Sequence, residues 1–140
     1  MTQASPHAPL TAAEIERLVA AFYARVRADE VLGPVFRRKI GTSEEAWRHH
    51  EAKIAGFWRN ALGIQVGAYS GNPQMAHIGN SDVLPEHFPI WLGHFRATAD
   101  AVLTPAQAEA IHAMASRIGR GMAMGVENAR RPADAPPRLF

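Results

Sequence analysis

Four stretches of the chain repeat apolar residues at intervals of three and four, the spacing that places side chains on one face of a helix. They cover residues 11–29, 42–62, 85–103 and 104–131. No segment alternates convincingly between apolar and polar residues, as a strand with one buried face would. The pattern therefore predicts an all-α protein.

Three of these helices begin with the spacing of a capping box, in which a Ser or Thr and a Glu or Gln three residues later satisfy each other's backbone donors. The pairs are Thr11 with Glu14, Thr42 with Glu45, and Thr104 with Gln107. Gly33 and Pro34 are expected to stop the first helix. Pro89 is expected in the first turn of its helix or at a kink. Residues 63–75 have the composition of a loop.

The length of 140 residues suits one domain with a single core. Pro-rich stretches at both ends are expected to be loose. The sequence therefore predicts a flexible segment over residues 1–10, a folded domain over 11–131 and a flexible tail over 132–140.

The amino-acid composition excludes several kinds of site and argues against several kinds of partner. The absence of cysteine excludes disulfides, thiolate metal ligands, iron–sulfur clusters and thioether-linked haem. No apolar run is long enough for a membrane span, and no signal peptide is expected at the N-terminus, so we expect a cytoplasmic protein without a membrane partner. A formal net charge of +2 without a basic block gives little support to nucleic-acid binding.

Several polar side chains are expected on inward faces. His50 shares the apolar face of its helix with Ile54 and Phe57, whereas His49 points roughly 100° away. Tyr23 and Trp91 lie on or beside the apolar faces of two other helices. Taken singly, each is most simply a core residue whose polar atom finds one partner.

His77 lies in a short apolar element, "PQMAHIGN", between two loops. Taken alone, His77 is most simply interpreted as a surface histidine in a loop. If His77 points inward together with Tyr23, His50 and Trp91, however, the core is unusually polar for its size. A site of protein ligands alone has no H-x-x-x-H pair to support it, and a Ser-His-Asp site has no nucleophile elbow. A flat apolar cofactor whose iron is held by one histidine fits these residues better, although a cofactor-free helical interaction module stays open.

The chain resembles a truncated haemoglobin of the third group from about residue 15 to residue 118. The stretches that carry the resemblance are "AFYARVRADEVLGPVF", "IGTSEEAWRHHEAKIAGFW", "YSGNPQMAHI" and "HFPIWLGHF". The absence of a Gly-Gly doublet agrees with the third group rather than with the first two.

The resemblance implies a truncated 2-on-2 helical sandwich around non-covalent haem b. His77 matches the proximal histidine that binds the iron, and Lys53 matches a residue that pairs with a haem propionate. Tyr23, His50 and Trp91 match the polar cluster on the opposite, distal side. The apolar residues that the resemblance places around the haem are Phe36, Ile54, Phe57, Phe88 and Phe95.

The function so implied is binding of O₂, NO or CO at a histidine-ligated iron. Several donors around bound O₂ would slow its release, which suits NO- or peroxide-related redox chemistry with a reductase better than transport. The alternative is a ligand sensor or store that acts through a partner.

Overall fold

The computed structural model describes residues 10–64 and 83–129, which form helices and no strand. In chain order the helices are α1 (Ala12–Ala28), α2 (Leu32–Ile40), α3 (Glu44–Ala61), α5 (His87–Val102) and α6 (Pro105–Ala129). The expected all-α class is confirmed. None of these helices is both long enough and apolar enough to cross a bilayer.

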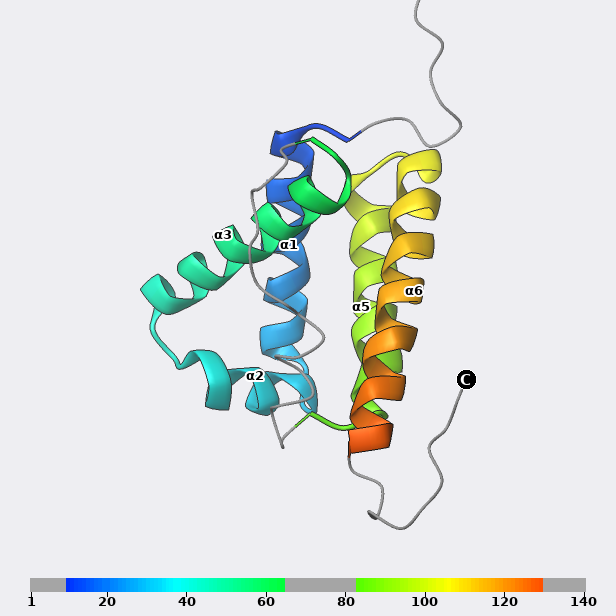
Figure 1. Cartoon of the computed structure of the whole chain (residues 1–140). Helices are drawn as coiled ribbons and strands as arrows, with labels where there is room; N and C mark the ends of the chain where they lie inside the picture. The colour runs from blue at the N-terminus through cyan, green and yellow to red at the C-terminus, as the bar shows by residue number, and fades with distance from the viewer. Residues whose placement is uncertain (1–9, 65–82, 130–140) are drawn as a thin grey trace, which may run out of the picture.

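The helices form two pairs. Figure 1 shows α3 crossing α1 obliquely, while α5 and α6 run side by side in opposite directions. The first pair meets the second mainly where α1 packs against α5, and the short α2 touches α1, α3 and α5. This arrangement of two helices on two helices agrees with the expected 2-on-2 sandwich.

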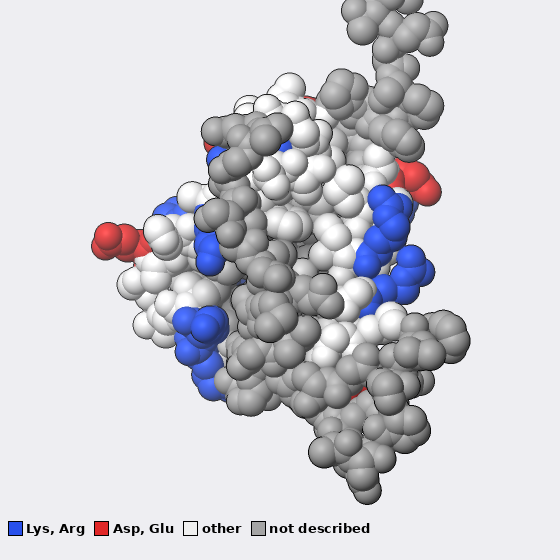
Figure 2. Space-filling model, viewed as in Figure 1, with Lys and Arg blue, Asp and Glu red and all other residues white. Residues whose placement is uncertain are grey.

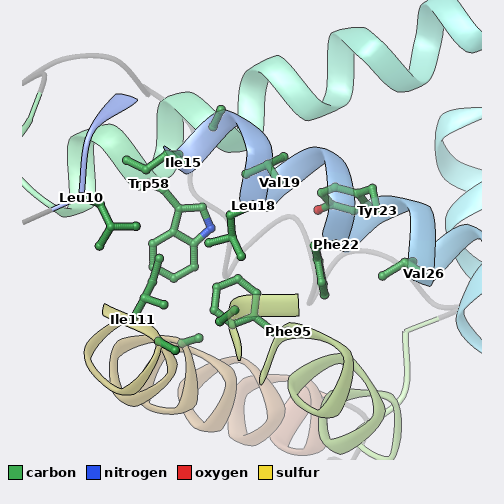
Figure 3. Close-up of a cluster of buried hydrophobic side chains, with 14 of the residues drawn as sticks. Leu10, Ile15, Leu18, Val19, Phe22, Tyr23, Val26, Trp58, Phe95 and Ile111 are labelled. Atoms are coloured by element: carbon green, nitrogen blue, oxygen red, sulfur yellow. The ribbon is translucent and has the colours of Figure 1, made fainter. Parts of the chain in front are cut away.

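The core lies between α1 and the α5–α6 pair. The apolar stripe of α1 is buried along its length, as its spacing predicted: Ile15, Leu18, Val19, Phe22 and Val26. Figure 3 shows Phe95 of α5 and Ile111 of α6 facing this stripe. Burial of such aliphatic and aromatic side chains stabilises the fold by about 1.5–3 kcal/mol each, so the core fixes α1 firmly relative to the second pair.

Two of the expected capping boxes are present. The Glu14 N–H donates to Thr11 Oγ1 (3.1 Å) and the Thr11 N–H donates to Glu14 Oε1 (2.9 Å). In the box of Thr104 and Gln107, the Gln107 N–H donates to Thr104 Oγ1 (3.2 Å) and the Thr104 N–H donates to Gln107 Oε1 (3.0 Å). The Gln107 amide also donates to the Glu14 carboxylate at 3.4 Å, so the starts of α1 and α6 are linked. The backbone hydrogen bond from Thr11 lowers the pKa of Glu14.

The third predicted cap is shifted by one residue. Ser43, not Thr42, is the N-cap of α3, and its hydroxyl accepts from the Ala46 N–H at 3.1 Å. Farther along α3, Trp47 is fully buried, and its indole donates to the Gly41 carbonyl at 3.0 Å. The guanidinium of Arg27 lies 4.7 Å from the centre of the Trp47 ring system and pairs with Glu44 at 2.8 Å. The beginning of α3 is therefore fixed against the end of α1.

The segment expected only to break the first helix also begins a second one. Gly33 and Pro34 are the second and third residues of α2, where a helix requires no N–H from proline. The Asp29 carboxylate accepts from the Val31 and Leu32 N–H groups, each at 2.8 Å, and so supports this start. The helix ends at Gly41, whose φ of 105° strongly favours glycine.

Candidate functional site

A pocket lies where all five described helices meet. Most of its walls are aliphatic or aromatic, and two histidines and a tyrosine interrupt them. The lining residues are Tyr23, Leu32, Val35, Phe36, His50, Ile54, Phe57, Trp58, Val83, His87, Phe88, Trp91, Ile118 and Met122. A mostly apolar pocket with a few polar groups is the usual form of a small-molecule or cofactor site.

The face of α3 explains the position of His50. His50, Ile54 and Phe57 follow one another at intervals of four and three, and all three line the pocket. The neighbouring His49 is exposed. The buried residues Trp47 and Ala55 lie on an adjacent face of α3, which packs into the hydrophobic core. The helix thus divides its inner surface between the core and the pocket.

Tyr23 and His50 meet in this pocket. The Tyr23 oxygen lies 3.2 Å from His50 Nε2, and the two rings meet edge to face with their centres 5.0 Å apart. Burial and, to a lesser extent, the negative charge of Glu51 raise the pKa of the Tyr23 hydroxyl above its ordinary value. The hydroxyl therefore stays protonated at neutral pH and can donate a hydrogen bond.

Trp91 brings a second donor to the pocket. Its ring lies edge to face with Phe22 (5.8 Å between centres) and stacks on Phe95 (5.7 Å). The indole N–H has no hydrogen-bond partner among the described residues. Because an indole N–H can only donate, this group is available to an acceptor in the pocket.

Most of the residues predicted for the site come together. Tyr23, His50 and Trp91 all line the pocket, as do the apolar residues Phe36, Ile54, Phe57 and Phe88. Phe95 instead lies in the core, 1% exposed, stacked between Trp58 and Trp91. Lys53 is exposed on α3 and is not a lining residue. His77 falls outside the described residues.

His87 is the polar lining residue that sequence reasoning missed. It stands four positions before Trp91, hence on the same face of α5, and this spacing could have identified it. The other lining residues that were not predicted are Leu32, Val35, Trp58, Val83, Ile118 and Met122.

No group of three or more His, Cys, Asp or Glu side chains suitable for a metal ion exists in the described ranges. Those residues thus offer no cage of protein ligands for a bare ion. Basic side chains gather over α2 on the face shown in Figure 2, where the last turn holds Arg37, Arg38 and Lys39. This turn directly follows Phe36 in the sequence, and the guanidinium of Arg37 donates to the Arg27 carbonyl at 3.3 Å.

Comparison with known proteins gives one curated relative and one solved structure. No family model matches the chain. The group 3 truncated hemoglobin ctb of Campylobacter jejuni is 41% identical over 88 residues, which are 63% of this chain and 68% of that protein. The crystal structure of a group III truncated hemoglobin from Campylobacter jejuni superposes with a TM-score of 0.79 at 34% identity, covering 82% of this chain and 90% of that one. The sequence identity and the common arrangement of helices agree, and this chain belongs to the group III truncated haemoglobins.

Proposed function

We propose that the pocket holds haem b, with His77 as the axial ligand of the iron, and that the protein binds O₂, NO or CO. Bound haem would supply an iron that takes a diatomic gas. The observation that carries the proposal is the hydrogen-bonded pair of Tyr23 and His50 inside a mostly apolar pocket. The curated relative and the solved structure are both named as truncated hemoglobins, which supports the haem.

The described residues fit such a group. A porphyrin needs broad apolar contacts, and the walls supply them from five helices. The core aromatics Phe22 and Phe95 hold the Trp91 ring by edge-to-face contact and stacking, so the indole donor is positioned before any ligand arrives. No buried side-chain donor or acceptor among the described residues lacks a partner, so the unpaired indole N–H is partly accessible and can donate to a molecule bound in the pocket.

The polar cluster would act on the gas ligand by hydrogen bonding. In the tautomer that carries its proton on Nε2, His50 would donate to the Tyr23 oxygen, and the Tyr23 O–H would then donate to the ligand. Trp91 N–H is the second donor. Each net hydrogen bond contributes roughly 0.5–1.5 kcal/mol, so two bonds worth about 2 kcal/mol together slow release of O₂ about 30-fold.

Slow release favours chemistry on the bound gas over transport. We propose NO- or peroxide-related redox chemistry that depends on a reductase. Tyr23 and Trp91 would supply hydrogen bonds to negative charge that develops on the ligand oxygen, and the apolar walls would limit access of water. Because Tyr23 keeps its proton well above neutral pH, this donation does not depend on pH in the physiological range.

Absorption spectra test the proposal directly. The purified full-length chain is titrated with haemin and measured in the ferric and ferrous forms, with and without CO. We expect stoichiometric binding, a Soret band and a five-coordinate histidine-ligated ferrous spectrum. A folded protein that takes up no haemin would refute haem binding. Another outcome is that the haem-loaded protein binds gas while its oxygenated form consumes no NO and the protein activates no peroxide. That result would refute the proposed redox chemistry and leave a gas store or sensor as the function.

A further inference from the structure

We infer that His87 is a haem anchor that donates its Nε2–H to a carboxylate of the bound porphyrin. The inference rests on the proposed haem binding and concerns a residue that has no part in the distal cluster. It starts from the position of His87 as the first residue of α5, where it is half-buried and lines the pocket.

The ring of His87 is held by its own loop. The Leu84 backbone N–H donates to His87 Nδ1 at 3.0 Å, and the backbone N–H of His87 donates to the Leu84 carbonyl at 3.0 Å. A backbone N–H can only donate, so Nδ1 must be the unprotonated acceptor. The proton of the neutral imidazole then lies on Nε2. His87 therefore offers the pocket a donor with a fixed orientation.

The same hydrogen bond argues against His87 as the axial ligand. A histidine that binds a metal through Nε2 carries its proton on Nδ1 and donates it to an acceptor. In this structure the Leu84 N–H faces Nδ1, so two donors would oppose each other. The Nε2 atom of His87 is thus better suited to donate a hydrogen bond to an acceptor than to bind a metal ion.

The place of His87 in the pocket indicates which acceptor it meets. His87 adjoins Phe88, which packs with Val35, Val83 and Met122 in a cluster separate from the one that holds Tyr23. One helical turn, about 6 Å along the axis, separates His87 from Trp91. The donor therefore lies apart from the groups proposed to act on the gas.

A carboxylate is the acceptor that matches this place. The two carboxylates are the only acidic groups of haem b, and they need a partly solvated edge because burial of a charge is unfavourable. His87 has no hydrogen-bond partner for Nε2 among the described residues. Lys53, which is exposed on α3, stays the other expected partner of a propionate.

Rates of haem loss test this assignment. The ferric full-length protein is mixed with an excess of a haem-free scavenger globin, and transfer is followed in the Soret region. His87→Asn keeps an acceptor near the position of Nδ1 but cannot reach the carboxylate. We expect it to lose haem about tenfold faster than wild type, since hydrogen bonds to charged groups are the stronger ones. His49→Asn, an exposed change on α3, is the matched control and should leave the rate unchanged.

A second porphyrin separates anchoring from general damage to the pocket. Iron protoporphyrin dimethyl ester lacks the negative charges, so the difference between His87→Asn and wild type should shrink greatly with it. His87→Gln places an N–H donor near the Nε2 position and should keep a loss rate close to wild type. If His87→Asn does not fold, His87→Gln and His87→Leu carry the same comparison.

The outcomes distinguish the two proposals. Equal loss rates for wild type and His87→Asn with haem b would overturn the anchor and leave the haem pocket intact. The anchor also fails if the variant loses the ester and the free acid equally faster, because a structural defect then explains the effect. A wild-type chain that binds no porphyrin would overturn haem binding and the anchor with it.

Discussion

The Tyr23 hydroxyl lies 3.2 Å from His50 Nε2, although 27 positions separate the two residues. The contact exists because α1 and α3 cross at this point and because Trp47, held by Arg27 and Gly41, fixes the beginning of α3. Each residue alone is an ordinary half-polar side chain on an apolar helix. Their contact inside a pocket makes a preorganised donor.

Removal of the Tyr23 hydroxyl should speed O₂ release. In Tyr23→Phe we expect an off-rate about fivefold higher, the value of one net hydrogen bond of about 1 kcal/mol. Stopped-flow displacement of O₂ measures the rate. Bound CO carries less negative charge, so its off-rate should change little and serves as the control. An unchanged O₂ off-rate would show that Tyr23 is not the donor.

His77→Ala should abolish the histidine-ligated ferrous spectrum, because the proposed axial ligand is lost. Added imidazole should restore that spectrum by filling the space left by the side chain. The matched variant His50→Ala removes the histidine proposed for the distal side and should retain a five-coordinate histidine-ligated form. If His77→Ala keeps the wild-type ferrous spectrum without imidazole, another histidine binds the iron.

Local spacing predicted most of the helices because caps and apolar stripes depend on residues three and four positions apart. The box of Thr104 and Gln107 and the buried stripe of α1 are examples. The short α2 was missed because Gly33 and Pro34 were read only as breakers. Its start depends on the Asp29 side chain and on contact with α1, and periodicity in nine residues is too short to show either.

The site could be predicted only in part, for a related reason. Periodicity indicates which face of α5 is buried, so His87, Trp91 and Phe95 share one stripe. It does not indicate where along that stripe the pocket ends and the core begins. The first two line the pocket, whereas Phe95 is stacked on Trp58 inside the core. The contact of Tyr23 with His50 depends on the crossing of two helices, which only the resemblance to a known family suggested.

The Asp29 carboxylate should contribute measurably to stability. It lies 2.7 Å from His94 Nε2 on α5 and supports the start of α2 through two backbone donors. Asp29→Ala removes all three bonds, and we expect the free energy of unfolding to fall by about 1–3 kcal/mol in urea titrations. Asp100→Ala removes only the exposed pair with Arg96 and should cost less than about 1 kcal/mol. Equal losses in the two variants would contradict a special role for Asp29.

The same carboxylate predicts a pH dependence. The hydrogen bond from His94, followed by those from the backbone, lowers the pKa of Asp29 in the folded state. A lowered pKa contributes stability that is complete above the unfolded value of about 3.9 and is lost as the pH falls through the folded value. The difference in unfolding free energy between wild type and Asp29→Ala should therefore shrink as the pH is lowered from about 5 toward 2. A difference that grows on acidification would contradict this linkage.

Gly33 should be required by close packing rather than by backbone conformation. A Cβ at this position would lie 2.9 Å from the Arg27 carbonyl oxygen, a backbone atom that cannot move without shifting the end of α1. We expect Gly33→Ala to destabilise the protein by about 1–3 kcal/mol, as overpacking usually does. It should also speed haem loss, because α2 supplies Phe36 and Val35 to the pocket.

Gly121 in α6 has open space at its Cβ position, so Gly121→Ala should instead stabilise by about 0.5–1 kcal/mol through helix propensity. Urea titration of both variants gives the sign directly, and a Gly33→Ala variant as stable as Gly121→Ala would show that α2 can move away from α1 at no cost.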